Sequence, residues 1–296
     1  MKILKALGLA TVLTVNVLAV DKVVYGDDNR QDLYEVTNSL YLELANSTAA
    51  MISGYNIKID QNDKVEFTGQ RTLAQRGICE YEKFTEQLAM ANCSGFLVGE
   101  DLLVTAGHCI KSMDNCESYK WVFNYAHSTN NTSEAMSLTK RDVYGCKEIV
   151  ERSLERGTKD DYALIRLDRK VEGRTPLKVR LDGKVSDGED LVVIGHPTGI
   201  PTKIADDANV RNNSNSVFFT ANLDTFGGNS GSAVFNTNTG EVEGILVRGE
   251  TDYVYDWSKG CRKVNVCTDE GCRGEDVTRI TNITVSYTHL TLPTIE

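Results

Sequence analysis

The sequence has few histidines, little basic charge and no long apolar stretch in its body, and each shortage excludes a class of protein. Only four histidines occur among 296 residues, which argues against a metal site. Acidic residues outnumber basic ones by 42 to 32, and the net charge of −10 argues against nucleic acid or an anionic membrane as the main partner. After residue 19, no stretch is apolar enough for a transmembrane helix.

The first 19 residues have the features of a secretory signal peptide. Lys2 and Lys5 precede an apolar run over residues 6–19, which ends in the small-residue cleavage site Val17-Leu18-Ala19. A membrane anchor is the alternative, but the run is short for crossing a bilayer. We therefore expect an exported protein, either extracellular or periplasmic.

The cysteine content agrees with export into an oxidising compartment. The eight cysteines are Cys79, Cys93, Cys109, Cys116, Cys146, Cys261, Cys267 and Cys272. A zinc site is the alternative for the last three, but their spacing fits no common zinc pattern, so we expect no metal. Spacing alone does not determine which cysteines pair, although Cys116 with Cys146 is one candidate bridge.

Residues 285–296 do not fit the rest of the chain. The stretch from Val285 to Thr294 resembles one reading frame of a transposase adapter used in DNA sequencing libraries. We therefore treat 285–296 as an artefact and expect the native sequence beyond Thr284 to be missing. His289 then carries no function.

From about residue 47 onward, short β-type segments alternate with turns. Residues 96–98 and 102–104 form a predicted hairpin, and residues 163–168 alternate between apolar and other side chains. No stretch shows three or four turns of convincing helical periodicity, and only residues 31–50 hint at a short helix. Strands at this density favour β-barrels or a sandwich over an α/β fold.

One glycine-flanked serine has the surroundings that a nucleophile needs. Ser230 lies in Phe226-Gly227-Gly228-Asn229-Ser230-Gly231-Ser232, between two apolar segments. Such a serine needs an accessible hydroxyl and backbone N–H groups directed at the attacked carbonyl. Glycine permits the tight turn because it reaches positive φ without steric cost. Ser232 is the alternative nucleophile, but it lacks the preceding Gly-Asn pair.

A serine nucleophile also needs a base, and histidine transfers protons most readily near neutral pH. His127 lies in a polar loop and is expected to be a solvated surface residue. His196 precedes Pro197 in a turn and is expected to be structural. His108, in Thr105-Ala106-Gly107-His108-Cys109, is the predicted base.

The base in turn needs a buried carboxylate to orient it. Asp161 directly precedes the alternating segment 163–168 and is the best candidate, with Asp160 as the alternative. The blocks around His108, Asp161 and Ser230 resemble those of the chymotrypsin/trypsin family, in that family's order. The resemblance extends from about residue 93 to 249.

This resemblance implies an all-β fold of two six-stranded Greek-key β-barrels, with the active site in the cleft between them. It also implies a catalytic triad of His108, Asp161 and Ser230, with the N–H groups of Gly228 and Ser230 as the oxyanion hole. A disulfide between Cys93 and Cys109 would fix the histidine loop.

Specificity is predicted from the same resemblance. Asp224, six residues before Ser230, stands where trypsin-like enzymes place the pocket carboxylate that binds Lys or Arg. A turn aspartate is the alternative. Gly249 stands where the family binds the substrate backbone as an extended strand. Glutamyl endopeptidases share the Gly-Asn-Ser-Gly-Ser pattern, but Leu246 replaces their pocket histidine.

The chain therefore divides into a signal peptide (1–19), an N-terminal or pro segment (20–50), a protease domain (51–284) and the artefact (285–296). Residues 23–30 resemble the mature start of glutamyl endopeptidases, which predicts a cut after Lys22. We interpret the protein as a secreted, cofactor-free, monomeric serine endopeptidase that cleaves proteins or peptides after Lys or Arg. The alternatives are glutamyl specificity and a catalytically inactive, protease-like binding protein.

Overall fold

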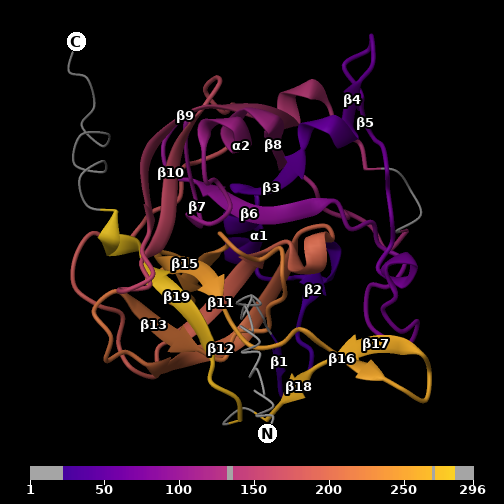
Figure 1. Cartoon of the computed structure of the whole chain (residues 1–296). Helices are drawn as coiled ribbons and strands as arrows, with labels where there is room; N and C mark the ends of the chain where they lie inside the picture. The colour runs from indigo at the N-terminus through magenta and orange to yellow at the C-terminus, as the bar shows by residue number, and fades with distance from the viewer. Residues whose placement is uncertain (1–22, 132–135, 269–270, 284–296) are drawn as a thin grey trace, which may run out of the picture.

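Two closed β-barrels form the body of the protein in the computed structural model (Figure 1). The structure describes residues 23–131, 136–268 and 271–283. The signal peptide, the expected cut after Lys22 and the tail over 285–296 lie outside the described residues. The prediction of an all-β protein with two six-stranded barrels is confirmed.

The first barrel is antiparallel throughout and has the strand order β10-β7-β6-β3-β8-β9. Its strands are β3 (Thr48–Ser53), β6 (Ala91–Leu97), β7 (Leu102–Thr105), β8 (Tyr119–Phe123), β9 (Val143–Leu154) and β10 (Asp161–Leu167). The predicted hairpin is formed by β6 and β7, in which Leu97 pairs with Leu103. Side chains such as Phe96 and Trp121 fill the interior.

The second barrel has the order β11-β14-β15-β19-β13-β12, and pairing of β11 with β12 closes it. Its strands are β11 (Asp190–Gly195), β12 (Lys203–Asn212), β13 (Phe218–Ala221), β14 (Ala233–Asn236), β15 (Val242–Arg248) and β19 (Glu275–Arg279). Leu191, Phe219 and Val277 belong to its interior cluster. The largest buried cluster extends from the first barrel to Phe235 and Ile245 of the second, so apolar packing joins the two barrels.

The segment before β3 contacts mainly the second barrel, although β3 itself belongs to the first. Strand β1 (Val24–Tyr25) pairs in parallel with β18 (Val266–Cys267), and β2 (Gln31–Asp32) extends the sheet beside β12. The short helix expected here is α1 (Ser39–Ala45), which Asn38 caps by accepting a hydrogen bond from the Leu40 N–H. The lead-in is therefore an integral part of the fold.

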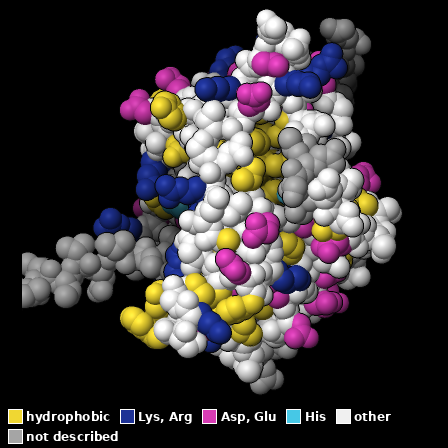
Figure 2. Space-filling view, turned by 90° about the vertical axis from the view of Figure 1, so that its right-hand side faces the viewer, with side chains coloured by type: hydrophobic (Ala, Val, Ile, Leu, Met, Phe, Trp, Pro, Cys, Tyr) yellow, Lys and Arg dark blue, Asp and Glu magenta, His cyan; other side chains and the backbone are white. Residues whose placement is uncertain are grey.

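Shorter elements cover the ends of the barrels. They are α2 (Met113–Ser118), the hairpins β4–β5 (Ile57–Ile59, Val65–Phe67) and β16–β17 (Tyr253–Asp256, Cys261–Val264), and six 3-10 turns: η1 (Leu33–Glu35), η2 (Gly54–Asn56), η3 (Ala74–Arg76), η4 (Lys140–Asp142), η5 (Pro197–Gly199) and η6 (Ile280–Asn282). The β16–β17 hairpin projects from the body and exposes Tyr255 and Trp257. Hydrophobic side chains also gather low on the face shown in Figure 2.

All eight cysteines form disulfides: Cys79–Cys261, Cys93–Cys109, Cys116–Cys146 and Cys267–Cys272. Cys93–Cys109 is the bridge that the family resemblance implied, and Cys116–Cys146 was the candidate left open by spacing. Cys79–Cys261 joins the β16–β17 hairpin to the segment before β6. Within the described ranges, no helix is both long and apolar enough to cross a membrane.

Candidate active site

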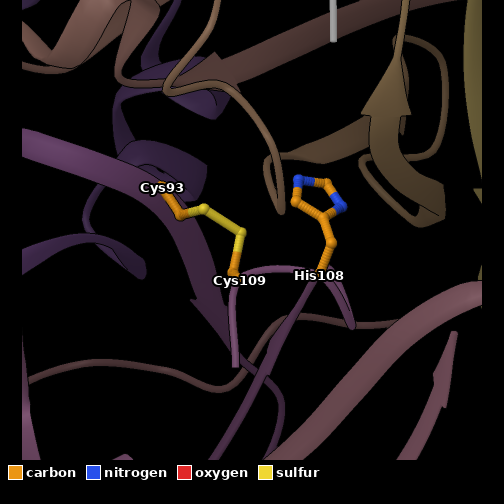
Figure 3. Close-up of side chains that lie close together, drawn as sticks. All are labelled: Cys93, His108 and Cys109. Atoms are coloured by element: carbon orange, nitrogen blue, oxygen red, sulfur yellow. A yellow bond between two sulfur atoms is a disulfide. The ribbon is translucent and has the colours of Figure 1, made fainter. Parts of the chain in front are cut away.

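The loop that follows β7 positions His108. Gly107 is required in this loop, because a Cβ there would lie 2.0 Å from the carbonyl oxygen of Ser153. The next residue, Cys109, is joined to Cys93 on β6, so the loop is held on both sides (Figure 3). These sulfur atoms lie near the His108 ring, but the disulfide occupies both of them and leaves no thiolate for a metal.

The His108 side chain is bound to Asp161, at the start of β10. Asp161 Oδ1 accepts from the His108 N–H at 3.0 Å, and Oδ2 lies 2.8 Å from Nδ1. Because a carboxylate only accepts, Nδ1 carries the proton and Nε2 is left as the basic nitrogen. The alternative carboxylate, Asp160, instead accepts from the Asn282 amide, and burial raises its pKa. Asp161 is therefore the orienting carboxylate in this geometry.

The turn that carries Ser230 packs against the ends of β6 and β7. The Ser230 carbonyl accepts from the Ser94 N–H at 2.8 Å. At Gly231, where φ is +90°, a Cβ would lie 2.3 Å from Thr105 Oγ1, so the close approach requires glycine. Ser230 thus lies at the base of the His108 loop, although their side chains share no hydrogen bond among the contacts described here.

The alternative nucleophile is held inside the protein. Ser232 is fully buried, and its hydroxyl donates to the Asn229 side chain at 3.3 Å. Ser230 is also largely buried, at 4% exposed, but within the described residues its hydroxyl has no protein partner, so it is the freer hydroxyl of the two.

Two N–H groups of the serine turn are available to an anionic oxygen. In the described part of the chain, the N–H groups of Gly228 and Ser230 donate to no protein acceptor, whereas those of Asn229, Gly231 and Ser232 all do. The Gly228 carbonyl is fixed by a 2.9 Å hydrogen bond from the hydroxyl of Ser94 in β6. Such a pair of free N–H groups is the arrangement of an oxyanion hole.

The structure confirms that His196 is buried in a turn, whereas the interpretation of His127 was wrong. The His196 ring lies between Ser94 Oγ and Thr202 Oγ1, each 3.1 Å from a ring nitrogen, and supports the serine turn from behind. His127 is buried and not solvated, because its loop folds over and lines a pocket with Leu33. Burial lowers the pKa of His127.

Buried His196 is expected to make the fold sensitive to acid. Burial lowers its pKa from 6.5 to about 3, so between these values the unfolded chain binds a proton that the folded chain does not. The stability contribution is present above pH 6.5 and is lost as pH falls towards 3, by up to about 5 kcal/mol. In urea titrations from pH 7 to 4, His196→Gln should lose stability less steeply than the wild type. If the stability of the two proteins falls equally steeply with pH, protonation of His196 is not the cause of the acid sensitivity.

Asp224 ties the N-terminal segment to the serine turn. Its buried carboxylate accepts from the N–H groups of Tyr25 at 2.7 Å and Asn29 at 3.2 Å. Burial raises the pKa of Asp224 to about 7, although both hydrogen bonds act in the opposite direction. The residue predicted to line the pocket is thus, in this structure, an anchor for the start of the described chain.

A second buried carboxylate, which sequence reasoning missed, is bound to the side chain of Thr225, the residue after Asp224. Glu275, the first residue of β19, accepts from Thr225 Oγ1 at 3.0 Å and from the Glu250 N–H at 3.3 Å. A Cβ at Gly249 would lie 1.7 Å from its Oε2, so any larger residue at 249 would displace the Glu275 carboxylate. No sequence signal marked Glu275, because it follows the segment covered by the family resemblance.

Arg248 was missed as well. It ends β15, and its guanidinium approaches Asp161 from the second barrel. The preceding residues predicted a strand, but nothing in the sequence indicated that this side chain reaches the carboxylate beside His108.

Comparisons with known proteins agree with the geometry. A model of the trypsin-like peptidase domain matches residues 93–245, and no curated protein matches the chain significantly. A Glu endopeptidase structure is 17% identical, with a TM-score of 0.53 and coverage of 90% of this chain and 98% of that one. An inactive serine-to-alanine mutant of Rv3671c from M. tuberculosis is 13% identical, with coverage of 92% and 98% and a TM-score of 0.47. The family match spans more than half of the sequence, and the chain belongs to the trypsin-like peptidase family.

Proposed function

We propose that the protein is a serine endopeptidase with His108, Asp161 and Ser230 as its catalytic triad. The observation that carries this proposal is the double hydrogen bond from His108 to Asp161, next to a serine turn with two free N–H groups. Each group then has a defined task in acyl transfer, and the reaction needs no cofactor.

In the proposed reaction, Ser230 Oγ attacks the peptide carbonyl while His108 Nε2 takes its proton. Asp161 stabilises the imidazolium that forms, and the N–H groups of Gly228 and Ser230 bind the developing oxyanion. His108 then gives its proton to the leaving amine, which departs and leaves an acyl-enzyme. Water, activated by His108, hydrolyses the ester and restores Ser230.

Cleavage after Lys or Arg is the proposed specificity. Two buried carboxylates are associated with Thr225, five residues before Ser230: Asp224 precedes it in the chain, and Glu275 accepts from its hydroxyl. A basic side chain entering this region gains a charge partner, whereas a glutamate side chain meets further negative charge. Gly249 supports binding of the substrate backbone as an extended strand.

Glutamyl specificity is the second candidate, favoured by the likeness to the Glu endopeptidase. At 17% identity this likeness concerns the fold, and Leu246 here is an apolar, fully buried residue of the barrel core. Secretion is also proposed, because a chain with all eight cysteines in disulfides suits an oxidising compartment. Protein or peptide substrates are the expected partners of a monomer.

A fluorophosphonate probe and a matched peptide series test the proposal. Stoichiometric labelling of Ser230 is expected, since the probe reacts with an activated serine. Peptides that differ only in the residue before the cleaved bond should be cut after Arg or Lys at least about 100-fold faster than after Glu or Phe. Asp224→Asn and Glu275→Gln, measured separately, should each reduce the rate after Arg.

Each possible result decides between the candidates. If Ser230 is labelled but the peptides are cut faster after Glu, the assignment of the triad stands and the proposed specificity is overturned. No labelling of the folded, disulfide-bonded, N-terminally processed protein would favour the protease-like binding protein.

A further inference from the structure

Arg248 connects the Asp161 carboxylate to the opposite barrel. Its Nη1 lies 3.6 Å from Asp161 Oδ2, the same oxygen that binds His108 Nδ1. Its Nε donates to Asp276 Oδ2 at 3.1 Å, and its Nη2 donates to the Lys159 carbonyl at 2.9 Å. One guanidinium therefore bridges β19 of the second barrel and the start of β10 in the first.

The surroundings of Asp161 contain several acidic groups, and in the described part of the chain Arg248 is the cation that pairs with it. Asp161 is almost completely buried, and Asp160 beside it is half-buried. Asp276 is also buried and shares Arg248 with Asp161, although Arg273 provides a second cation for it at 2.5 Å. Among the described residues, the charged or titratable groups on the elements packed around His108 and Asp161 are Arg248 and Asp276 from the second barrel, Glu151 and Arg152 from β9, and Lys159, Asp160 and Tyr162 along the chain. Of these, Arg248 is the one that forms an ion pair with Asp161.

We propose that Arg248 is a positioning residue of this site, which fixes the Asp161 carboxylate and limits how strongly it favours the protonated form of His108. The proposal rests on the serine-peptidase function proposed above. It follows from geometry, because the same Oδ2 of Asp161 lies 2.8 Å from the imidazole and 3.6 Å from the guanidinium. A cation there counteracts part of the carboxylate's charge, and hydrogen bonds through Nε and Nη2 hold the guanidinium in place beside it.

Two effects are expected when the cation is removed. Without Arg248, the Asp161 charge favours a protonated, inactive His108 more strongly, so the acid limb of the rate profile moves to higher pH. The distances predict a shift of about half to one pH unit. Looser positioning of Asp161 should also lower the maximal rate about 10-fold, because small displacements of a catalytic group are costly.

The experiment measures the rate at which the fluorophosphonate labels Ser230 between pH 4 and 9. This readout depends on His108 as base but not on the specificity pocket. Arg248→Met removes the charge and keeps most of the aliphatic stem, whereas Arg248→Lys keeps the charge. The acid limb should shift upward in Arg248→Met and stay within about 0.3 pH units of the wild type in Arg248→Lys.

Arg166 provides a matched control. It lies on the same strand as Asp161, pairs with two carboxylates (Asp101 at 2.9 Å and Glu148 at 2.8 Å) and is 28% exposed, against 26% for Arg248. Arg166→Met should therefore change stability by a similar amount without moving the acid limb. Thermal unfolding of all variants identifies any that fail to fold.

Failure of this inference is distinct from failure of the proposed function. If the wild-type protein is labelled but Arg248→Met has an unshifted acid limb, or if Arg166→Met shifts it equally, Arg248 is only a structural link between the barrels. If Arg248→Met does not fold, Arg248→Lys alone tests the proposal. A displacement of its acid limb by a full pH unit then contradicts the proposal. Absence of labelling in the wild type overturns the serine-peptidase function itself.

Discussion

Replacing Ser230 with alanine is expected to reduce kcat/KM by about 10⁶-fold while leaving the fold intact. The substitution removes only the nucleophile, and the residual rate of such variants comes from binding and the oxyanion hole. The barrels should not be affected, because Ser230 contributes its backbone, not its side chain, to the packing against Ser94. Initial rates on an arginine peptide and thermal unfolding of both proteins measure the two effects.

Ser232→Ala is the control for this experiment. Ser232 is buried two residues away, and its hydroxyl donates only to Asn229. Its loss should cost some stability and leave most of the activity. If Ser232→Ala were as inactive as Ser230→Ala while still folded, the assignment of the nucleophile would have to be abandoned.

Lys203→Met is expected to lower the free energy of unfolding by about 3–5 kcal/mol. Lys203 Nζ lies 2.5 Å from Asp32 Oδ1, and both side chains are almost completely buried. Burial lowers the pKa of Lys203 to about 8, so at neutral pH the amine is still the charged partner of Asp32. Removing it leaves the Asp32 carboxylate buried without its cation, which should detach β2 from β12.

Urea titration at pH 7 measures this loss. Lys170→Met provides the comparison, because Lys170 pairs with Glu100 on the exposed surface, where solvent screening leaves little contribution to stability. The double variant Lys203→Met/Asp32→Leu should recover part of the stability, since two apolar side chains replace two buried charges. A loss no larger than that of Lys170→Met would show that the buried pair contributes little.

The grouping of His108, Asp161 and Ser230 into one candidate site was predictable because its signals are local in the sequence. Gly107 and Gly231 are needed for close backbone contacts within the same short blocks that carry His108 and Ser230, so the blocks can be read directly. Strand alternation around residues 163–168 likewise marked the start of β10 and the position of Asp161.

The groups that surround this centre could not be predicted, because their contacts join distant parts of the chain. Asp224 meets Tyr25, and Cys79 pairs with Cys261 across 182 residues. Glu275 and Arg248 reach the site only because the second barrel closes around it. His127 was misjudged for the same reason: polar neighbours in sequence indicated solvent, whereas the tertiary fold covers the side chain.

The position of the N-terminal segment has a consequence for the timing of folding. Val24 pairs with Val266, and the Asp32–Lys203 ion pair joins β2 to β12, which is synthesised much later. These early residues therefore lack these partners until most of the chain has been synthesised. Contacts so far apart in sequence form slowly, because a long loop has to close first. The ribosome adds about 5–20 residues per second, which leaves the first strands unpaired for many seconds. We therefore expect the second barrel to be completed only after translation, with the cleft assembled as one of the last events.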